Sequence, residues 1–183
     1  MSLPLTPGTW SIDGAHSHVG FNVRHLGVAK VRGSFTSVEG TLAVGDTLGA
    51  VTLDVAIDLG SIDTGNADRD AHVRSSDILS AGEARMTYTS TSVDQQGDDY
   101  VVTGNLTING ATRPVTLDVE FEGVETNPFT QGTHAGFSAT GQLSRSDFGI
   151  NFNVPLAGDK VLLSDTVKLE IEAELVAPVL AAV

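Results

Sequence analysis

The 183-residue sequence has no cysteine and few basic or aromatic residues. The absence of cysteine excludes disulfide bridges, thiolate metal sites and a cysteine nucleophile. Lysine and arginine together number 10 against 23 acidic residues, which gives a net charge of −13. Because an acidic surface repels phosphate groups, we expect no nucleic-acid partner and no charge-driven binding to an acidic bilayer.

Long apolar runs are also missing, and the longest fall far below the ~20 residues that a membrane-spanning helix needs. Residues 1–7 have neither the basic nor the apolar region of a secretory signal. We therefore expect no membrane span and a cytoplasmic location, or a periplasmic or secreted one if a leader was removed ahead of this sequence. With 40% hydrophobic residues, the sequence predicts a single globular domain over residues 1–183.

Hydrophobic residues alternate with polar ones over much of the sequence. The clearest segments are 51–59, 100–108, 115–121 and 167–175. In the last of these, Val167, Leu169 and Ile171 alternate with Lys168 and Glu170. Successive side chains of a strand point to opposite faces, so each segment has one apolar face and one solvated face. This pattern is typical of antiparallel sheets.

Weaker strand segments and one helical segment complete the prediction. The shorter alternating segments are 19–25, 31–35, 86–88 and 135–143. About eight strands are therefore expected, which can close into a barrel or fold into a sandwich. The best helix candidate is Asn66–Ile78, in a connection around residues 66–80, with Asn66 as N-cap and Asp68 and Asp70 near the positive end of the helix dipole.

Short motifs follow one another in order from about residue 9 to residue 176. They are Trp10-Ser11-Ile12-Asp13, His16-Ser17, Gly33-Ser34-Phe35, Arg69-Asp70-Ala71-His72, Leu106-Thr107-Ile108 and Asp147-Phe148-Gly149. As an ordered set they resemble the YceI family, whose members are lipocalin-like barrels that bind polyisoprenoids. The resemblance implies an all-β, eight-stranded antiparallel lipocalin-like barrel. It also implies a non-catalytic carrier for a long apolar lipid, such as a polyisoprenoid or an isoprenoid quinone.

The resemblance places this lipid against the inward, apolar faces of the strands, with no other cofactor required. An eight-stranded barrel is just wide enough to be filled by side chains or to hold one small ligand. Because only 5% of the residues are aromatic, an interior of smaller aliphatic side chains can leave a tunnel. The alternative is an ordinary solid core. The predicted lipid-binding residues are Phe21, Val23, Phe35, Val55, Ile57, Met86, Tyr88, Leu106, Ile108, Leu117, Val119, Phe137, Phe148, Ile150, Leu169 and Ile171.

Three residues are candidates for contacts to a polar or phosphorylated headgroup at the barrel mouth, namely Arg24, Arg69 and His72. A guanidinium group suits this role because its N–H groups can bind a phosphate in a bidentate manner. The acidic residues of segment 63–77 favour a salt-bridged helical lid, in which Arg69 and Arg74 pair with those acids.

Other functions remain open at this point. In His16-Ser17-His18 two imidazoles share one face of a strand, as in a partial zinc site. A third ligand would come from His25, His72 or His134. No further metal motif supports such a site, so we expect no metal ligand and no catalytic residue. The alternatives are a hydrolase or metal-dependent enzyme that uses the His and Asp residues, and a packed-core stress or interaction protein. A homodimer is compatible with the sequence, which does not specify one.

Overall fold

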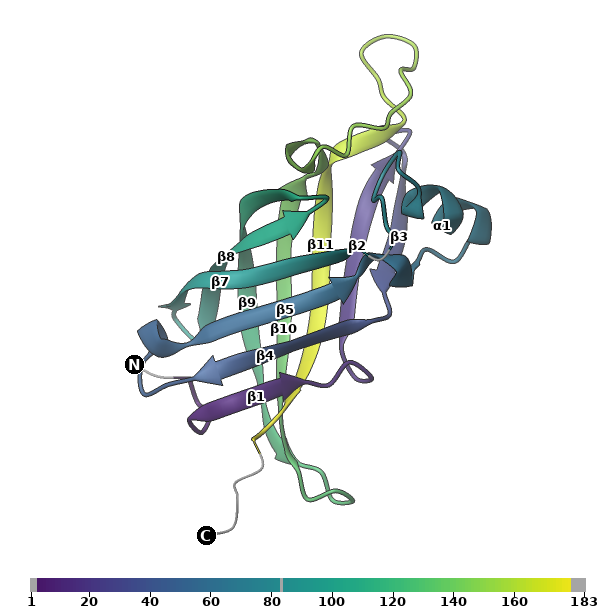
Figure 1. Ribbon diagram of the computed structural model, residues 1–183. Helices are drawn as coiled ribbons and strands as arrows, with labels where there is room; N and C mark the ends of the chain where they lie inside the picture. The colour runs from purple at the N-terminus through teal and green to yellow at the C-terminus, as the bar shows by residue number, and fades with distance from the viewer. Residues whose placement is uncertain (1–2, 83, 179–183) are drawn as a thin grey trace.

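The computed structural model describes residues 3–82 and 84–178, and most of these residues lie in strands (Figure 1). The strands are β1 (Gly8–Ile12), β2 (His18–His25), β3 (Ala29–Phe35), β4 (Val38–Val44), β5 (Thr52–Asp58), β6 (Ile62–Asp63), β7 (Arg85–Gln96), β8 (Asp99–Ile108), β9 (Ala111–Thr126), β10 (Thr133–Ser144) and β11 (Leu163–Val176). The helical elements are α1 (Ala67–Arg74) and the 3₁₀ turns η1 (Leu48–Ala50), η2 (Leu59–Ser61) and η3 (Arg145–Phe148). Among the described residues, no helix is long and apolar enough to cross a bilayer.

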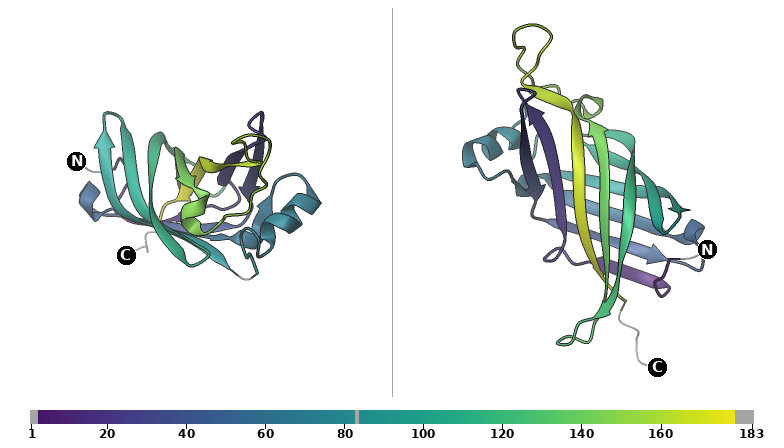
Figure 2. Two further views of the ribbon diagram at one scale, coloured as in Figure 1. Left: turned by 90° about the horizontal axis from the view of Figure 1, so that it is seen from above. Right: turned by 180° about the vertical axis from the view of Figure 1, so that it is seen from behind.

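Eight of the strands close into an antiparallel barrel, as the sequence predicted. Neighbours in this ring follow the order β1-β4-β5-β7-β8-β9-β10-β11, and β1 also pairs with β11. The closing contact is short, since it aligns Ser11 with Val176 and Ile12 with Leu175. The strands β2, β3 and β6 continue from β11 outside the ring. Figure 2 shows the barrel from above and from behind, with α1 beside the ring strands.

The eight strands of the ring are not the eight that the alternation identified. The predicted segments 19–25 and 31–35 form β2 and β3, which lie outside the ring. Two strands that the alternation did not identify, β1 and β4, belong to the ring. They have 5 and 7 residues, and β4 contains Gly40, so each carries too few alternating side chains to be recognised alone.

Buried side chains form two hydrophobic clusters at opposite ends of the ring strands. One cluster contains Leu59, Ile62 and Phe148, which come from the segments near α1 and η3. The other contains Trp10 and Leu3, which bring the N-terminal segment against the ring. The N-terminal segment is fixed there because the Trp10 indole N–H donates to the carbonyl of Thr6 at 3.0 Å.

The helix α1 begins where the sequence predicted, because the Asn66 side chain accepts a hydrogen bond from the backbone N–H of Arg69 at 2.9 Å. It ends at Arg74 rather than Ile78, since Ser75 has an extended backbone conformation.

Within residues 3–82 and 84–178, no hydrogen bond or ion pair joins Arg69 or Arg74 to an acidic side chain, so the predicted pairing of these arginines with the acids of segment 63–77 is wrong. Arg69 donates to the hydroxyl and the carbonyl of Thr64, each at 2.7 Å. Arg74 donates to the carbonyls of Gly60 and Ile62, at 2.9 and 2.6 Å. A guanidinium can satisfy several carbonyl groups at once, and here it fixes the chain that precedes the helix.

A third arginine, Arg145, is buried and joins η3 to its surroundings. Its side chain donates to the carbonyl of Ser164 at 3.0 Å and to those of Ile150 and Phe152 at 2.6 and 2.9 Å. Only 7% of the residue is exposed. The three carbonyl groups therefore compensate the buried positive charge of Arg145. In turn, Arg145 supplies the hydrogen-bond donors for these carbonyl groups.

We expect Arg145→Met to lower the free energy of unfolding by about 3 kcal/mol, because three carbonyl groups lose a charged donor in a poorly hydrated place. Urea denaturation followed by circular dichroism measures this loss. Arg113→Met is the matched control, since Arg113 is exposed and donates only to the adjacent Thr112 carbonyl among the hydrogen bonds found. Equal effects of the two substitutions would contradict the anchoring role.

Candidate functional site

The interior of the ring holds a cavity of about 190 Å³. Each of the eight ring strands contributes at least one lining residue, and so do the N-terminal segment and the residues around the start of β2. Apart from Ser17 and Glu172, the lining residues have aliphatic or aromatic side chains, and the surface that faces the cavity is apolar. The barrel centre is therefore neither a solid core nor a polar channel.

Ten of the predicted lipid-binding residues line this cavity. They are Val55, Ile57, Met86, Tyr88, Leu106, Leu117, Val119, Phe137, Leu169 and Ile171. Seven of them come from the four segments with the clearest alternation, and Met86, Tyr88 and Phe137 come from the weaker segments 86–88 and 135–143. Their contact with a ligand stays a prediction.

The other six predicted residues do not line the cavity. Phe35, Ile108, Phe148 and Ile150 are buried in the cluster near α1 and η3, and Phe21 packs against that cluster. Val23 is half-buried on β2, which lies outside the ring. Aromatic and aliphatic side chains therefore fill the barrel near α1, and the hollow part lies between this end and the N-terminal segment.

Seventeen lining residues were not predicted. They are Leu3, Ile12, Ser17, Val19, Val38, Leu42, Val51, Leu53, Val93, Tyr100, Val102, Val115, Ala139, Leu143, Glu172, Ala173 and Leu175. Several belong to strands whose inward face was already recognised, so the alternation itself was the signal that could have found them. Leu3, Ile12, Val38 and Leu42 belong to segments whose path depends on ring closure, which local patterning does not reveal.

Tyr88 lines the cavity without making it polar. Its single O–H proton is shared between the carbonyls of Val102 and Val115, which lie 3.2 and 3.1 Å from the hydroxyl oxygen. Burial raises the pKa of Tyr88 to about 12, so the phenol stays protonated and remains a donor at neutral pH. Gly104 makes room for this ring, because a Cβ atom there would lie 2.4 Å from the Tyr88 Cζ atom.

The three predicted headgroup residues lie away from the cavity lining. Arg24 is exposed on β2, outside the ring. Arg69 is engaged with Thr64, and His72 packs edge-on against Phe152 with ring centroids 4.7 Å apart. None of the three lines the cavity, and a role in headgroup binding stays a prediction for each.

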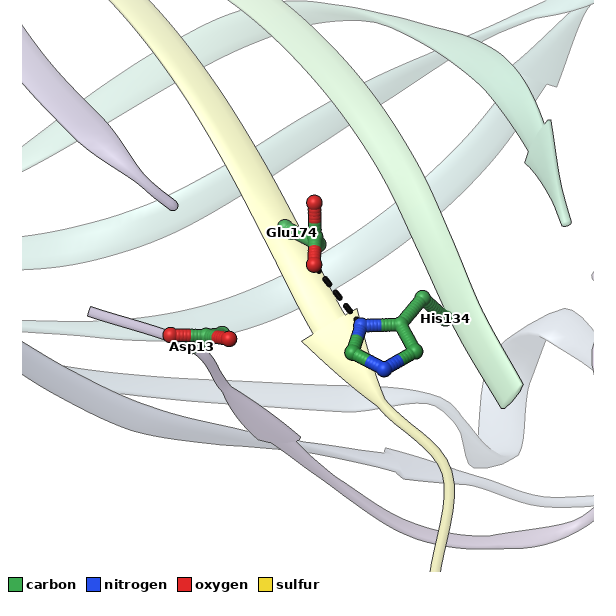
Figure 3. Close-up of side chains that lie close together, drawn as sticks. All are labelled: Asp13, His134 and Glu174. Carbon is green, nitrogen blue, oxygen red and sulfur yellow. Dashed lines mark hydrogen bonds and ion pairs between the residues drawn. The ribbon is translucent and has the colours of Figure 1, made fainter. Parts of the chain in front are cut away.

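A second group of side chains gathers on the outer surface, where β1, β10 and β11 meet (Figure 3). The Nδ1 atom of His134 lies 2.7 Å from Oε1 of Glu174. The Nδ1 atom of His16 lies 2.9 Å from Oδ2 of Asp13 and 3.9 Å from the same Glu174 oxygen. Ligand atoms of Asp13, His134 and Glu174 all lie within 4.8 Å of one another. We call these four residues the seam cluster.

The hydrogen bond between Asp13 and His16 favours the charged form of each side chain. It lowers the pKa of the Asp13 carboxyl below its ordinary value. The same bond, helped by the negative charges of Asp13 and Glu174, raises the pKa of the His16 imidazole.

The seam cluster only partly matches the histidine pair noted in the sequence. His16 belongs to it, whereas His18 is exposed on β2 opposite Glu172. Among the three residues considered as a third ligand, the structure brings His134 next to His16, through Glu174.

Comparison with known proteins agrees with this architecture. The model of the YceI-like domain family matches residues 10–175. Protein YceI of Salmonella arizonae is 38% identical over 153 residues, which cover 82% of this chain and 80% of that protein.

Solved structures with a similar fold include BcnA of Burkholderia cenocepacia, at 22% identity with a TM-score of 0.75, covering 89% of this chain and 98% of that one. The Campylobacter jejuni YCEI protein is 28% identical with a TM-score of 0.68, covering 85% of this chain and 90% of the other. A polyisoprenoid-binding domain from Saccharophagus degradans has a TM-score of 0.66 at 18% identity, covering 92% of this chain and 98% of that domain. On the extent of the family match and the identity to protein YceI, the chain belongs to the YceI-like domain family.

Proposed function

We propose that this protein binds a long apolar lipid, a polyisoprenoid or an isoprenoid quinone, inside the barrel and acts as a carrier rather than as an enzyme. The observation that carries the proposal is the apolar cavity to which every ring strand contributes. Membership of the YceI-like family supports it, as does the shared fold of a domain described as polyisoprenoid-binding. A stress or interaction protein with a filled barrel is disfavoured, because the barrel centre is hollow.

The size of the cavity limits how much of a lipid fits without rearrangement. Engineered apolar cavities of about 150 Å³ accept one benzene molecule and exclude water. A cavity of about 190 Å³ therefore holds a short stretch of an isoprenoid tail. A longer tail has to displace lining side chains, and the side chains available for this include half-buried ones such as Leu53, Val93 and Leu143.

Burial of the tail supplies the driving force, at about 25 cal/mol for each Å² of apolar surface removed from water. Such binding is non-directional, so the tail is selected by its length and shape rather than by polar contacts. We propose that Arg24, Arg69 or His72 contacts the polar headgroup of the lipid. No cofactor other than the lipid is required.

Affinity for isoprenoid alcohols of increasing length should rise as more units enter the barrel. Each buried methylene group contributes about 0.8 kcal/mol, so each added five-carbon isoprene unit should strengthen binding by roughly 100-fold or more until the barrel is full. Isothermal titration with a series of alcohols measures the dependence, and native mass spectrometry counts the bound molecules. No binding by any member, or an affinity independent of length, would exclude the carrier function.

Filling the cavity should prevent this binding. We expect Ala139→Phe to weaken binding of a long isoprenoid alcohol by at least tenfold, because the added ring occupies space that the tail needs. The single tryptophan, Trp10, is buried beside lining residues and reports binding through its fluorescence.

The matched control is Ala43→Phe on β4. Ala43 alternates with the buried Leu42 and Val44, so its side chain is on the outer face of the barrel. This variant should bind as the wild type does. If both phenylalanine variants bind equally well, the ligand does not occupy the cavity.

A further inference from the structure

We propose that the seam cluster, Asp13, His16, His134 and Glu174, binds one divalent transition-metal ion of the Zn²⁺ type. Imidazole nitrogens and carboxylate oxygens are ligands that Zn²⁺ takes in proteins. With neutral imidazoles the cluster carries two negative charges, which one divalent ion balances. The site lies on the outer surface of the barrel and is separate from the apolar cavity.

The atoms of the seam cluster converge on one carboxylate oxygen. The Oε1 atom of Glu174 lies 2.7 Å from Nδ1 of His134 and 3.9 Å from Nδ1 of His16. Ligands at about 2.0–2.2 Å from a tetrahedral Zn²⁺ ion are roughly 3.3–3.5 Å from one another. The observed separations, up to 4.8 Å for Asp13, His134 and Glu174, lie on both sides of this value. Side-chain adjustments of about 1 Å therefore suffice for Asp13, His134 and Glu174, whereas His16, which is outside the group that lies within 4.8 Å, has to rotate further about its side-chain bonds.

The backbone holds the seam cluster in place from two sides. The N–H of Asp13 donates to the carbonyl of Glu174 at 2.8 Å, and the N–H of Glu174 donates to the Ser17 hydroxyl at 3.0 Å. The turn that carries Asp13 and His16 is thereby fixed to β11. Opposite Glu174 on β10 lies Gly136, which has no side chain to occupy the space beside the carboxylate. A preorganised frame of this kind lowers the cost of assembling a metal site.

The contribution of the seam cluster to the stability of the fold does not explain why these four side chains lie together. Exposed ion pairs contribute little to folding because water and salt screen them. The imidazole of His16 is 65% exposed and hydrogen-bonds to Asp13 at 2.9 Å, and its Nδ1 atom lies 3.9 Å from the Glu174 oxygen that is 2.7 Å from Nδ1 of His134. Two histidines that share one glutamate in this way are better explained by a common positively charged ligand.

Titration of metal-free, untagged protein with Zn²⁺, in competition with a chromophoric chelator, tests the site. We expect one ion per chain. His134→Ala and Glu174→Gln should each lower the affinity more than roughly 100-fold, since even residues next to a metal ligand commonly matter by about 10–100-fold. Binding of Co²⁺ should give the absorption bands of a four-coordinate ion, and His134→Ala should abolish them.

His18→Ala and His72→Ala are the controls, because both histidines are partly exposed and neither belongs to the seam cluster. Neither should change Zn²⁺ affinity. Circular dichroism confirms folding of each variant, and His16→Ala replaces any variant that does not fold. Absence of stoichiometric binding, or equal losses in His18→Ala and His134→Ala, would overturn the assignment.

A different surface, at the other end of β11, carries a second inference. We infer that this end of the molecule docks on an anionic lipid bilayer. Its basic patch consists of Arg24, Lys30, Arg32 and Lys168. Its apolar tip consists of Leu26, Val28, Val154 and Val161. The hairpin between β2 and β3 and the loop that leads into β11 lie together at this end (Figures 1 and 2).

The register of β2 with β3 and β11 brings the four side chains of the basic patch close together. Arg24 lies directly opposite Lys30, and Asn22 lies opposite both Arg32 and Lys168. Like charges directly opposite each other destabilise a strand pair. None of the four takes part in an ion pair found between described residues. One carboxylate lies beside this patch, since Glu170 accepts from Asn22 at 2.9 Å, and a surface of anionic headgroups would supply the remaining counter-charge although the chain as a whole carries −13.

The apolar tip exposes several large apolar side chains to solvent, without a folded core to bury them. Val28 is 79% exposed, and Leu26 has a φ of 55° in a turn where asparagine or glycine is usual. The N–H of Leu26 donates to the Leu162 carbonyl at 2.8 Å, which joins the hairpin to the loop that contains Val154 and Val161. Apolar side chains bordered by cations are the combination that inserts into a bilayer interface.

Co-sedimentation with vesicles of phosphatidylcholine, with and without phosphatidylglycerol, tests the docking surface. The wild type should bind only the mixed vesicles, and added salt should weaken binding. Arg24→Gln combined with Lys30→Gln should weaken it about 25-fold, at roughly 5-fold for each charge. Val28→Asp should weaken it further.

Arg113→Gln and Phe129→Asp are the matched controls, since both residues are exposed and Phe129 is an apolar residue of a different loop. Both should bind as the wild type does. No binding of the wild type to mixed vesicles, or equal losses in the controls, would overturn the inference. Vesicle binding needs no ligand in the barrel, so its failure leaves the carrier function untouched.

Discussion

Closure of the barrel depends on the short strand β1, which pairs with β4 on one side and with β11 on the other. This pairing satisfies the backbone groups of two sheet edges that would otherwise be exposed. It requires glycine at position 40, because a Cβ atom there would lie 2.4 Å from the Asp54 carbonyl oxygen and 2.9 Å from Cδ1 of Ile12. An open sheet would expose its apolar face to water, whereas the closed ring encloses it and leaves the cavity between the two buried clusters.

The same seam connects the inside of the barrel with its outer surface. Ile12 directs its side chain into the cavity, and the next residue, Asp13, belongs to the seam cluster. Ser17 lines the cavity and also hydrogen-bonds to the backbone of Glu174. Since one short turn serves both sites, an ion held by the seam cluster would stabilise the segment that closes the barrel, by binding only the folded arrangement.

Alternation in the sequence predicted antiparallel strands and the inward position of ten lining residues, because period two records which face of a strand is buried, and the family resemblance implied the barrel rather than a sandwich. Alternation could not identify β1 and β4, which are defined by pairing with distant strands rather than by their own patterns. Alternation also could not distinguish residues that line the cavity from residues that fill the closed end of the barrel. Phe148 and Leu117 are equally apolar in the sequence, yet Phe148 packs at the closed end and Leu117 faces the cavity. That distinction depends on depth along the barrel axis, which only the closed ring defines.

Net charge averages over surfaces that differ in their local charge, so the expected repulsion from acidic bilayers stays a prediction. A charge of −13 predicted repulsion from acidic bilayers, yet the register of β2, β3 and β11 gathers four of the chain's 10 cations on one patch. The seam cluster and the apolar tip lie toward opposite ends of β11, a strand of 14 residues that spans roughly 45 Å at about 3.3 Å per residue. This separation exceeds several screening lengths at physiological salt, so the charges of the seam cluster are screened from the basic patch, whereas Glu170, which accepts from Asn22, lies beside it. If the proposed docking occurs, it orients the molecule with the basic patch toward the membrane and the seam cluster toward solvent.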